Sequence, residues 1–450
     1  MQASFSPLRR WLALLFIVGL LLFAAFLWLR PLLNIGSGYA AKHACSCHFL
    51  QGRELEEIST HDLNFSVLGW FSLAVEGQTV RASLLSLVAR EAHYRPGVGC
   101  TLVNDPNQAL APILGADAGA PPRPPEGGSK DEGAMLVNPT ETTPALTAAL
   151  DFGMEPVPGG GARGIVVLQD GKLLAETYAP GFDRTTPLLG WSMTKTLTAL
   201  LVGHVLLAPD GSNLEEVVNR KRLYPAWNTD ARANIRLADL LHMNSGLAWN
   251  EGYGSLTDAT IMLHEQPAMA AYASGMPAEF APGETWRYSS GTTNILADLV
   301  QRQLPPGTDL ATYLRAYFRP VAPSLLVEPD QSGLPVGSSY GWATAQDWAR
   351  LGQFMLQDGV WGGDTLLPPG WIDWLQQPAA GSEGTYGGQL WLPGPDMPSL
   401  PPDAFMMRGF QDQRVFIIPS RRLVIARLGH GEDKVTDFDG LVSRILAAVE

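Results

Sequence analysis

The sequence predicts an α+β fold with one antiparallel sheet flanked by helices, a mostly helical second lobe, and one N-terminal transmembrane helix. Two pairs of strand-like segments, each joined by a short turn, enclose a long stretch of helical and loop pattern. Strands at both ends of a helical middle favour a single antiparallel sheet over a βαβ alternation. The 450 residues are 46% hydrophobic and 17% charged, so the chain can bury a large core.

The first segment, residues 1–34, has the pattern of a signal-anchor. Trp11–Leu29 is apolar except for one glycine and follows Arg9 and Arg10. A helix of that length spans about 28 Å, close to the hydrocarbon thickness of a bilayer. A cleaved signal peptide usually has an apolar core of only about 7–15 residues, so retention of the segment is favoured. Cleavage within the small residues of Gly36–Ala41 stays open as the alternative.

The charges of the chain predict where it resides and what it binds. Arginines before the apolar run favour a cytoplasmic N-terminus, so we expect a single-pass inner-membrane protein whose remaining residues are periplasmic. The 44 acidic and 31 basic residues give a net charge of −13, which repels phosphate backbones. The predicted partner is therefore a membrane, through the N-terminal helix, and not nucleic acid.

Three further sections follow the anchor. Residues 35–103 mix short alternating runs with loop residues and are expected to form a small strand-containing segment. Residues 104–142 are a linker rich in proline and glycine, without an apolar period. Residues 143–450 have the length and pattern of one large domain.

The chain has three cysteines, Cys45, Cys47 and Cys100. Because thiols outside the cytoplasm tend to pair, we predict a Cys45–Cys100 disulfide that adds about 2–4 kcal/mol of stability and leaves Cys47 free. A Cys45–Cys47 bridge would strain its ring, and three reduced thiols are the remaining alternative. His43 and His48 flank the first two cysteines, but ligands crowded so closely leave no loop to wrap a metal. We therefore predict no metal site.

Within the last domain, both strand pairs have clear turn signals. Asp-Gly joins Gly164–Gln169 to Lys172–Tyr178, and such a dipeptide supplies the positive φ angles of a two-residue hairpin. Pro-Ser-Arg-Arg joins Arg414–Ile418 to Leu423–Arg427 in a second hairpin. Apolar residues at helical spacing over 438–449 predict a closing helix.

The first catalytic candidates are Ser192 and Lys195. They open an apolar stretch, residues 196–207, whose helix we expect to be buried. Their i,i+3 spacing places both on one face, and burial together with the positive end of the helix dipole disfavours a charged lysine. A neutral amine beside a hydroxyl is the base that a nucleophilic serine needs. The alternative is a helix-capping serine beside a surface lysine.

A third candidate is Tyr288, which precedes an apolar helix pattern over 294–300. A tyrosine on a loop that opens a helix can carry a proton between the lysine–serine pair and a leaving group. A plain packing role is the alternative. The chain lacks the second glycine of a nucleophile elbow and the histidine spacing of a zincin, so neither offers a rival site.

These motifs, in this order, resemble the serine β-lactamase-related hydrolases, which include class C β-lactamases, D-Ala-D-Ala carboxypeptidases and related esterases. Two further stretches are similar to motifs of that superfamily, Asn244–Leu247 and Ala343–Arg350. The resemblance covers about residues 143–450 and implies the serine β-lactamase and penicillin-binding-like fold.

Within that superfamily, the chain looks most like the 6-aminohexanoate-dimer hydrolase-like proteins. The similar stretches are Tyr288–Ser290, Tyr386–Trp391 and Gly409–Gln413. The last of these departs from the family pattern, because Asp412 stands where a glycine is expected.

The resemblance implies acyl transfer without a cofactor. Ser192 would attack the carbonyl carbon of an amide or ester, Lys195 would take its proton, and Tyr288 would relay that proton to the leaving group. The backbone N–H groups of Ser192 and Phe410 would form the oxyanion hole. The implied partner is a small-molecule or peptide-like amide or ester substrate.

Four further residues are candidates for substrate contact: Trp391, Gly409, Gln411 and Gln413. For Trp391 and the two glutamines, a structural role is equally open. Two other activities fit the same motifs, a penicillin-binding-like D-Ala-D-Ala carboxypeptidase and a β-lactamase. A catalytically inactive binding or sensor domain on this fold is the alternative from another class. The intact serine, lysine and tyrosine argue against it, because a binding module has no need of a desolvated lysine.

Overall fold

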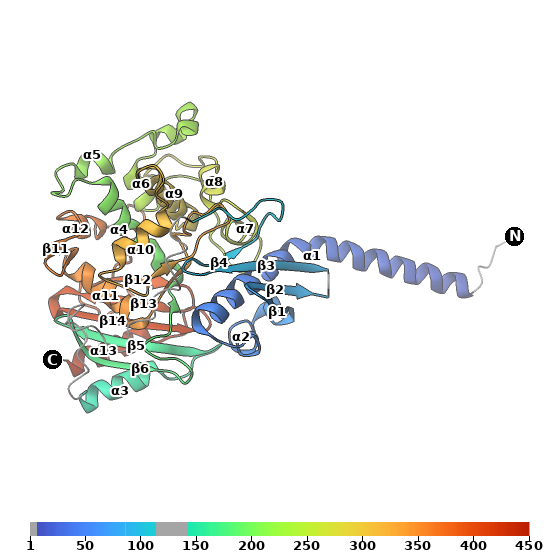
Figure 1. Cartoon of the computed structure of the whole chain (residues 1–450), viewed down its shortest axis with the longest axis horizontal. Coiled ribbons are helices and arrows are strands. Elements are labelled where there is room, and N and C mark those ends of the chain that lie inside the picture. Colours follow the sequence, from blue (N-terminus) through green and yellow to red (C-terminus); the bar gives the residue numbers. More distant parts are fainter. Residues whose placement is uncertain (1–6, 86, 114–141, 450) are drawn as a thin grey trace.

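A single long helix, α1 (Pro7–Gln51), begins the described chain and carries the predicted membrane segment. The computed structural model describes residues 7–85, 87–113 and 142–449. Figure 1 shows the N-terminal half of α1 projecting away from the rest of the molecule, while its C-terminal half lies against it. Within the described ranges, α1 is the one helix long and apolar enough to cross a membrane, with a mean hydropathy of 2.9 in its apolar window.

The boundary expected at residue 34 falls inside α1, which continues without a break into the body of the molecule. The helix is exposed along its apolar run and becomes buried from Leu33 onward. A Cβ on Gly38 would lie 3.2 Å from the carbonyl oxygen of His264, so no larger residue fits there without a shift. The small residues of 36–41 therefore have a packing role in α1, separate from the cleavage alternative.

The C-terminal half of α1 packs on a four-stranded antiparallel sheet, and we call residues 35–103 the N-terminal module. The strands pair in sequence order. The disulfide between Cys45 of α1 and Cys100 of the last strand, the pairing expected from the sequence, joins helix to sheet with Cα atoms 6.0 Å apart. The elements after α1 are α2 (Leu55–His61), η1 (Ser66–Trp70), β1 (Ser72–Glu76), β2 (Thr79–Leu84), β3 (Val88–Arg95) and β4 (Gly99–Leu102).

The larger domain is built on a five-stranded antiparallel sheet with the strand order β12-β13-β14-β5-β6. Both expected hairpins are present, and the two meet where β14 pairs with β5, with Val424 opposite Leu168. The edge strand β12 was not expected from the sequence. The strands are β5 (Gly161–Gln169), β6 (Lys172–Tyr178), β12 (Phe405–Gly409), β13 (Gln413–Ile418) and β14 (Leu423–His430).

Alternating residues of this sheet face two separate helical layers, as a strand period of two requires. Ile165 and Val167 share a core with α3 (Pro144–Gly153) and α13 (Phe438–Ala448), which is the expected closing helix. Val166 and Leu168 face the opposite core, which contains α11 (Ala345–Leu356). The α+β prediction is confirmed.

A mostly helical lobe lies beyond α11, and α4 passes through its centre (Figure 1). Its helices are α4 (Thr194–Leu206), α5 (Leu214–Val218), α6 (Leu237–Leu241), α7 (Asp258–Glu265), α8 (Met269–Ser274), α9 (Ser290–Gln301), α10 (Leu310–Phe318) and α12 (Trp371–Leu375). Short strands and 3₁₀ turns accompany them: β7 (Leu188–Leu189), η3 (Trp191–Met193), η4 (Pro225–Thr229), η5 (Ala231–Asn234), β8 (Leu326–Val327), β9 (Gly341–Ala343), β10 (Val360–Trp361) and β11 (Asp364–Thr365). A further 3₁₀ turn, η6 (Pro419–Arg421), joins β13 to β14 of the sheet.

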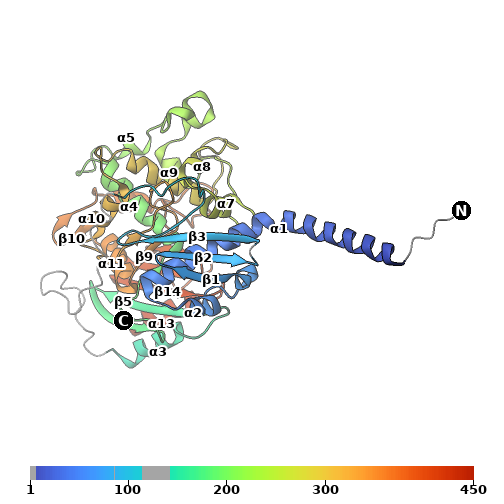
Figure 2. The ribbon, with the colours of Figure 1, turned by 45° about the vertical axis from the view of Figure 1, so that its right-hand side comes forward.

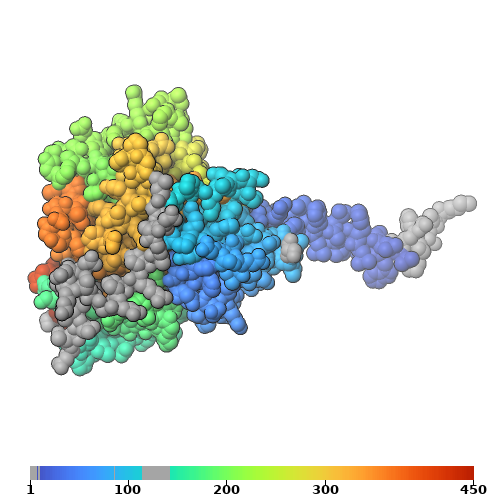
Figure 3. Space-filling view, in the orientation of Figure 1, coloured from blue at the N-terminus to red at the C-terminus, as the bar shows by residue number. Residues whose placement is uncertain are grey.

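The N-terminal module is seated on the larger domain, next to the projecting part of α1 (Figure 3). Trp342 of β9 belongs to the core of the module, so the two share apolar packing. The start of the expected linker also lies against the larger domain, because the Gln331 side chain accepts from the backbone N–H of Asn104 and Asp105. Residues 114–141 of the linker lie outside the described residues.

Candidate active site

The turn that carries Ser192 is held in an uncommon backbone conformation. Gly190 follows β7, and a Cβ there would lie 2.2 Å from the ring of Trp348, so only glycine fits. Trp191 has a φ of 47°, in the left-handed region that non-glycine residues rarely adopt. Strained backbone of this kind concentrates at functional sites, where the surrounding packing maintains it. The turn places Ser192 in η3, just before α4 begins.

Lys195 lies on the first turn of α4 with its amine directed at Ser192. Its Nζ is 2.9 Å from Ser192 Oγ, 2.9 Å from Ser290 Oγ and 3.0 Å from the Ser338 carbonyl oxygen. The side chain is 1% exposed. Burial lowers the pKa of Lys195 to about 8, although the negative charge of Glu251 opposes the shift. An amine with this pKa can accept a proton from the adjacent hydroxyl near neutral pH.

Ser290 and Glu251 complete the surroundings of the amine, and neither was predicted as a site residue from the sequence. The Glu251 carboxylate accepts from the Ser290 backbone N–H at 2.8 Å and from the Ser290 hydroxyl. Ser290 thus stands between the carboxylate and the amine. Its signal was the third position of the Tyr288–Ser290 motif, whereas Glu251 lies on a loop without a motif.

Tyr288 lies beside the same amine. Its ring centroid is 4.8 Å from Lys195 Nζ. Burial, followed by the charge of Glu251, raises the pKa of Tyr288, and a hydrogen bond with Ser192 opposes the shift. The phenol therefore keeps its proton at neutral pH. The Trp391 ring packs 5.5 Å from the Tyr288 ring, which brings this candidate for substrate contact next to the site.

The end of β12 lies directly beside the serine turn. A Cβ on Gly409 would lie 2.1 Å from the Gly190 carbonyl oxygen, so glycine is required for this approach. The Phe410 ring packs 5.7 Å from Trp191. Gln411 accepts a hydrogen bond from Trp191 Nε1 at 3.1 Å. The end of β12 and the serine turn are thus joined by a ring contact and a hydrogen bond, both made by Trp191.

The two residues after Gln411 shape this loop. Gln413 donates to the carbonyl oxygens of Gln411 and Gly429 and accepts from the Gly429 N–H, each at 2.8 Å. Gln413 was open to substrate contact or to a structural role, and these contacts favour the structural role. Asp412 has a φ of 61°, in the left-handed region that favours glycine, the residue expected at this position. Its carboxylate accepts from the backbone N–H of Lys434 at 2.9 Å and of Val435 at 3.0 Å.

Helix α1 reaches the far side of the serine turn. The Tyr39 ring stacks on Trp191 at 5.9 Å with an angle of 20° between their planes. The His43 ring lies 6.4 Å from Trp191 and parallel to it within 5°. The N-terminal module therefore supports the residue that precedes Ser192.

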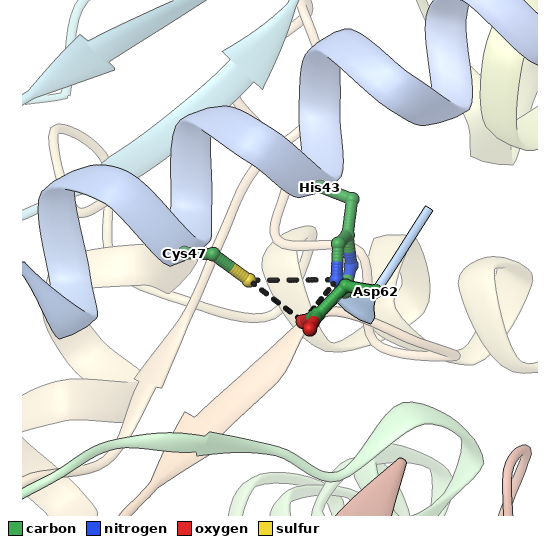
Figure 4. A group of neighbouring side chains, drawn as sticks. All are labelled: His43, Cys47 and Asp62. Carbon is green, nitrogen blue, oxygen red and sulfur yellow. Dashed lines mark hydrogen bonds and ion pairs between the residues drawn. The ribbon is translucent and has the colours of Figure 1, made fainter. Parts of the chain in front are cut away.

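Figure 4 shows His43 and Cys47, one turn apart on α1, facing Asp62. His43 Nε2 lies 3.2 Å from Asp62 Oδ2 and 3.4 Å from Cys47 Sγ. Burial alone would lower the pKa of His43, but Cys47 and Asp62 raise it to about 9. The Asp62 carboxylate is bound by the guanidinium groups of Arg53 and Arg163. These contacts form an ion-pair network that ties α1 to β5 of the larger domain.

Comparison with known proteins identifies the family. The beta-lactamase family model matches residues 153–450. The chain belongs to the beta-lactamase family. It is 26% identical to the 6-aminohexanoate-dimer hydrolase of Paenarthrobacter ureafaciens in an alignment 313 residues long, which covers 63% of this chain and 76% of that protein. The expected resemblance is confirmed.

Solved structures of other proteins share the fold of this beta-lactamase family member. A penicillin-binding protein homologue from Caulobacter crescentus aligns with a TM-score of 0.51 and 16% identity, covering 68% of this chain and 98% of that chain. A family VIII carboxylesterase aligns with a TM-score of 0.50 and 12% identity, covering 68% of this chain and 98% of that chain. The family model and the curated relative assign the chain to the hydrolases with the beta-lactamase fold.

Proposed function

We propose that this protein is a membrane-anchored serine hydrolase that cleaves an amide or ester through an acyl-enzyme on Ser192. The observation that carries the proposal is the Lys195 amine, which is 2.9 Å from the Ser192 hydroxyl, 1% exposed, and has its pKa lowered to about 8. A buried lysine is costly unless it is paired, and Lys195 contacts hydroxyl and carbonyl oxygens. In this arrangement the Lys195 amine is placed to accept the proton of the Ser192 hydroxyl.

In the first half-reaction, Lys195 Nζ takes the Ser192 proton as Oγ bonds to the substrate carbonyl carbon. The carbonyl π electrons move to its oxygen and form a tetrahedral oxyanion. When the C–N or C–O bond of the leaving group breaks, Tyr288 donates its proton there and regains one from the Lys195 ammonium. In the second half-reaction, Lys195 Nζ takes a proton from water as the water oxygen bonds to the acyl carbon. The bond between that carbon and Ser192 Oγ then breaks, Oγ takes the proton from Lys195, and the carboxylic acid product leaves. Ser192 is then free again.

The oxyanion requires donors placed before the reaction begins. The close approach of Gly409, which precedes Phe410, to the carbonyl of Gly190, two positions before Ser192, supports a shared position for the backbone N–H groups of Phe410 and Ser192. The hydrogen bond from Trp191 to Gln411, 3.1 Å long, holds the two segments together. The backbone N–H groups of Ser192 and Phe410 are therefore the proposed oxyanion hole.

The proposed substrate is a small amide or ester. A 6-aminohexanoate-dimer hydrolase is among the relatives of this chain, and Trp391 and Phe410 offer aromatic surface beside Tyr288 and Trp191. Hydrolysis of a panel of nitrophenyl esters, linear amides, D-Ala-D-Ala peptides and nitrocefin ranks the leaving groups. Preference for esters or linear amides supports the proposal, and preference for nitrocefin or the peptides favours a β-lactamase or carboxypeptidase.

Active-site labelling tests the nucleophile. A fluorophosphonate probe should label the full-length chain and should not label Ser192→Ala, which retains the melting temperature of the unmodified protein. Ser443→Ala, on α13, is the matched control and should be labelled fully. Labelling that persists in Ser192→Ala refutes the assignment, and an unlabelled, folded wild-type protein supports an inactive binding domain instead.

The proposed location is the inner membrane, with α1 as a single span and the larger domain in the periplasm. The Cys45–Cys100 disulfide supports an oxidising compartment. Alkaline phosphatase fused after about residue 140 should be active, because it folds only outside the cytoplasm. An inactive phosphatase, together with a fluorescent cytoplasmic reporter at the same site, would show the opposite orientation.

A further inference from the structure

Large apolar side chains are exposed mainly in one region of the body. Among the described residues beyond α1, those at least a third exposed are Phe65, Trp70, Val75, Leu85, Leu87, Tyr253, Leu256 and Val360. Five of these eight belong to the N-terminal module. The most exposed are Leu85 at 82%, Trp70 at 64% and Leu87 at 55%. Scattered apolar residues are normal on a surface, but a cluster of the largest ones indicates a partner.

Leu85, Leu87 and Trp70 lie at the same end of the module sheet. Leu85 and Leu87 follow the last residue of β2 and precede β3, and Leu84 pairs with Val88 at the end of that hairpin. Trp70 is close in space, because Ser72 at the start of β1 pairs with Ser83 near the end of β2. We call Trp70, Leu85 and Leu87 the apolar tip.

The backbone of the apolar tip is unfavourable for the residue it carries. Leu85 has a φ of 47°, in the left-handed region where glycine or asparagine is usual in a hairpin turn. A leucine there is strained, and its side chain packs against little else, since it is 82% exposed. Folding alone gives no reason for a leucine at this position.

The apolar tip is level with the end of the apolar run of α1. Ser37 of α1 donates to the carbonyl oxygen of Ala82, which fixes β2 beside the helix. From Ala82 to Leu85 the strand advances about 10 Å, and from Ser37 back to Arg30 the helix advances about 10 Å. Figures 1 and 2 show the β2–β3 hairpin pointing along α1, on the side from which the helix leaves the body. Phe26 packs against the core of the module, which therefore extends to the last turns of the apolar run.

We propose that the apolar tip docks into the interfacial region of the same bilayer that α1 crosses, as a second point of attachment. Tryptophan and leucine beside a membrane span are suited to this depth, where the headgroups meet the acyl chains. One helix alone leaves the body free to tilt relative to the membrane plane. A second contact on one side of α1 fixes which face of the body is turned toward the membrane. The proposal rests on α1 being a membrane span.

Depth-dependent fluorescence quenching tests the docking on the full-length chain. Cys47→Ser removes the free thiol while the Cys45–Cys100 disulfide stays, and single cysteines are then introduced by Leu87→Cys, Leu20→Cys or Leu256→Cys. Each receives the same environment-sensitive fluorophore and is reconstituted into phosphatidylcholine vesicles that contain lipids with a nitroxide near the headgroup or along the acyl chain. Leu256 is the matched control, because it is a leucine of similar exposure, 48%, on the larger domain.

We expect headgroup-level nitroxides to quench the Leu87→Cys label, acyl-chain nitroxides to quench the Leu20→Cys label, and neither to quench the Leu256→Cys label. If Leu20→Cys is quenched but Leu87→Cys is as bright as Leu256→Cys, the docking is wrong and the anchor stands. If Leu20→Cys is not quenched, α1 does not insert and both statements are wrong. Quenching of Leu256→Cys would mean that the whole body sinks into the lipid, which also contradicts a specific tip. Fluorophosphonate labelling of the same samples reports the hydrolase separately.

Discussion

The described part of the chain contains two buried serine–lysine pairs, and only one of them is proposed to be catalytic. Lys195 Nζ lies 2.9 Å from Ser192 Oγ, and Lys42 Nζ lies 3.0 Å from Ser46 Oγ. Both lysines are nearly inaccessible, with exposures of 1% and 4%. Burial lowers the pKa of both amines. The pairs differ in the position of the nearest carboxylate.

Lys42 is in direct contact with Glu328, which also accepts from the Ser46 hydroxyl at 2.8 Å. The Lys42 amine therefore contacts both the Ser46 hydroxyl and the Glu328 carboxylate, and the ion pair ties α1 to the loop after β8. Near Lys195, the carboxylate of Glu251 is bound to Ser290, and Ser290 stands between it and the amine. One interposed hydroxyl thus distinguishes the amine that is proposed to act as a base from the amine of a structural ion pair.

The largest effect is expected when the amine can no longer release its proton. Lys195→Arg keeps a cation at the same place, but a guanidinium does not deprotonate at working pH. We expect kcat/KM for a soluble nitrophenyl ester to fall by about 10³-fold or more. The matched change, Lys42→Arg, keeps the ion pair with Glu328 and should leave kcat/KM within about tenfold of wild type. Equal losses in both variants would remove the distinction between the pairs.

The second prediction concerns stability and has opposite signs at the two sites. Lys42→Met leaves Glu328 buried without its cation and should lower the free energy of unfolding by about 3–5 kcal/mol. Lys195→Met removes an amine that folding has to desolvate, without leaving a carboxylate in contact, so stability should be unchanged or higher. Urea unfolding of the detergent-solubilised protein measures both. A destabilised Lys195→Met, similar to Lys42→Met, would show that Lys195 is also a structural residue.

Local sequence patterns record the lysine–serine spacing of each pair but not the carboxylate that distinguishes the two. Ser192 and Lys195 are three residues apart at the start of an apolar helix, so their contact follows from local geometry. Glu328 approaches Lys42 across 286 positions of the chain, and Glu251 approaches Ser290 across 39. Such contacts depend on tertiary packing, which no local pattern records.

The elements of the fold divide in the same way, into those with a local sequence signal and those without one. Hairpins with turn signals were predicted, because residues 170–171 and 419–422 supply local turn geometry. The strand β12 pairs with β13 across a loop of left-handed residues such as Gln411 and Asp412, and it had no turn signal. The continuity of α1 through residue 34 was missed as well, because small residues at a tight helix contact also fit a cleavage site.

The third prediction is a pH dependence that belongs to Lys195. Because the pKa of Lys195 is lowered to about 8, the amine is protonated below that pH and cannot take the Ser192 proton. The value of kcat/KM should fall about tenfold for each pH unit below about 8 and level off above it. Measurement with an ester whose hydrolysis is monitored across neutral and mildly alkaline pH gives the profile. An acid limb centred near the imidazole range instead would assign the base to another group.

The smallest effect should come from the carboxylate one hydroxyl away. Glu251 raises the pKa of Lys195, so Glu251→Gln should lower that pKa further and move the acid limb to lower pH. The shift should be less than about one pH unit, because the charge acts through Ser290 and not in contact. At neutral pH, a larger fraction of the Lys195 amine is then neutral. The ratio of kcat/KM at neutral pH to its plateau value at high pH should therefore rise a few-fold. This holds even if the plateau value itself falls because Ser290 loses one hydrogen bond. Glu216→Gln, an exposed glutamate on α5, is the control and should leave the limb in place. An acid limb that stays fixed in Glu251→Gln, or moves to higher pH, would show that Glu251 does not set the charge of Lys195.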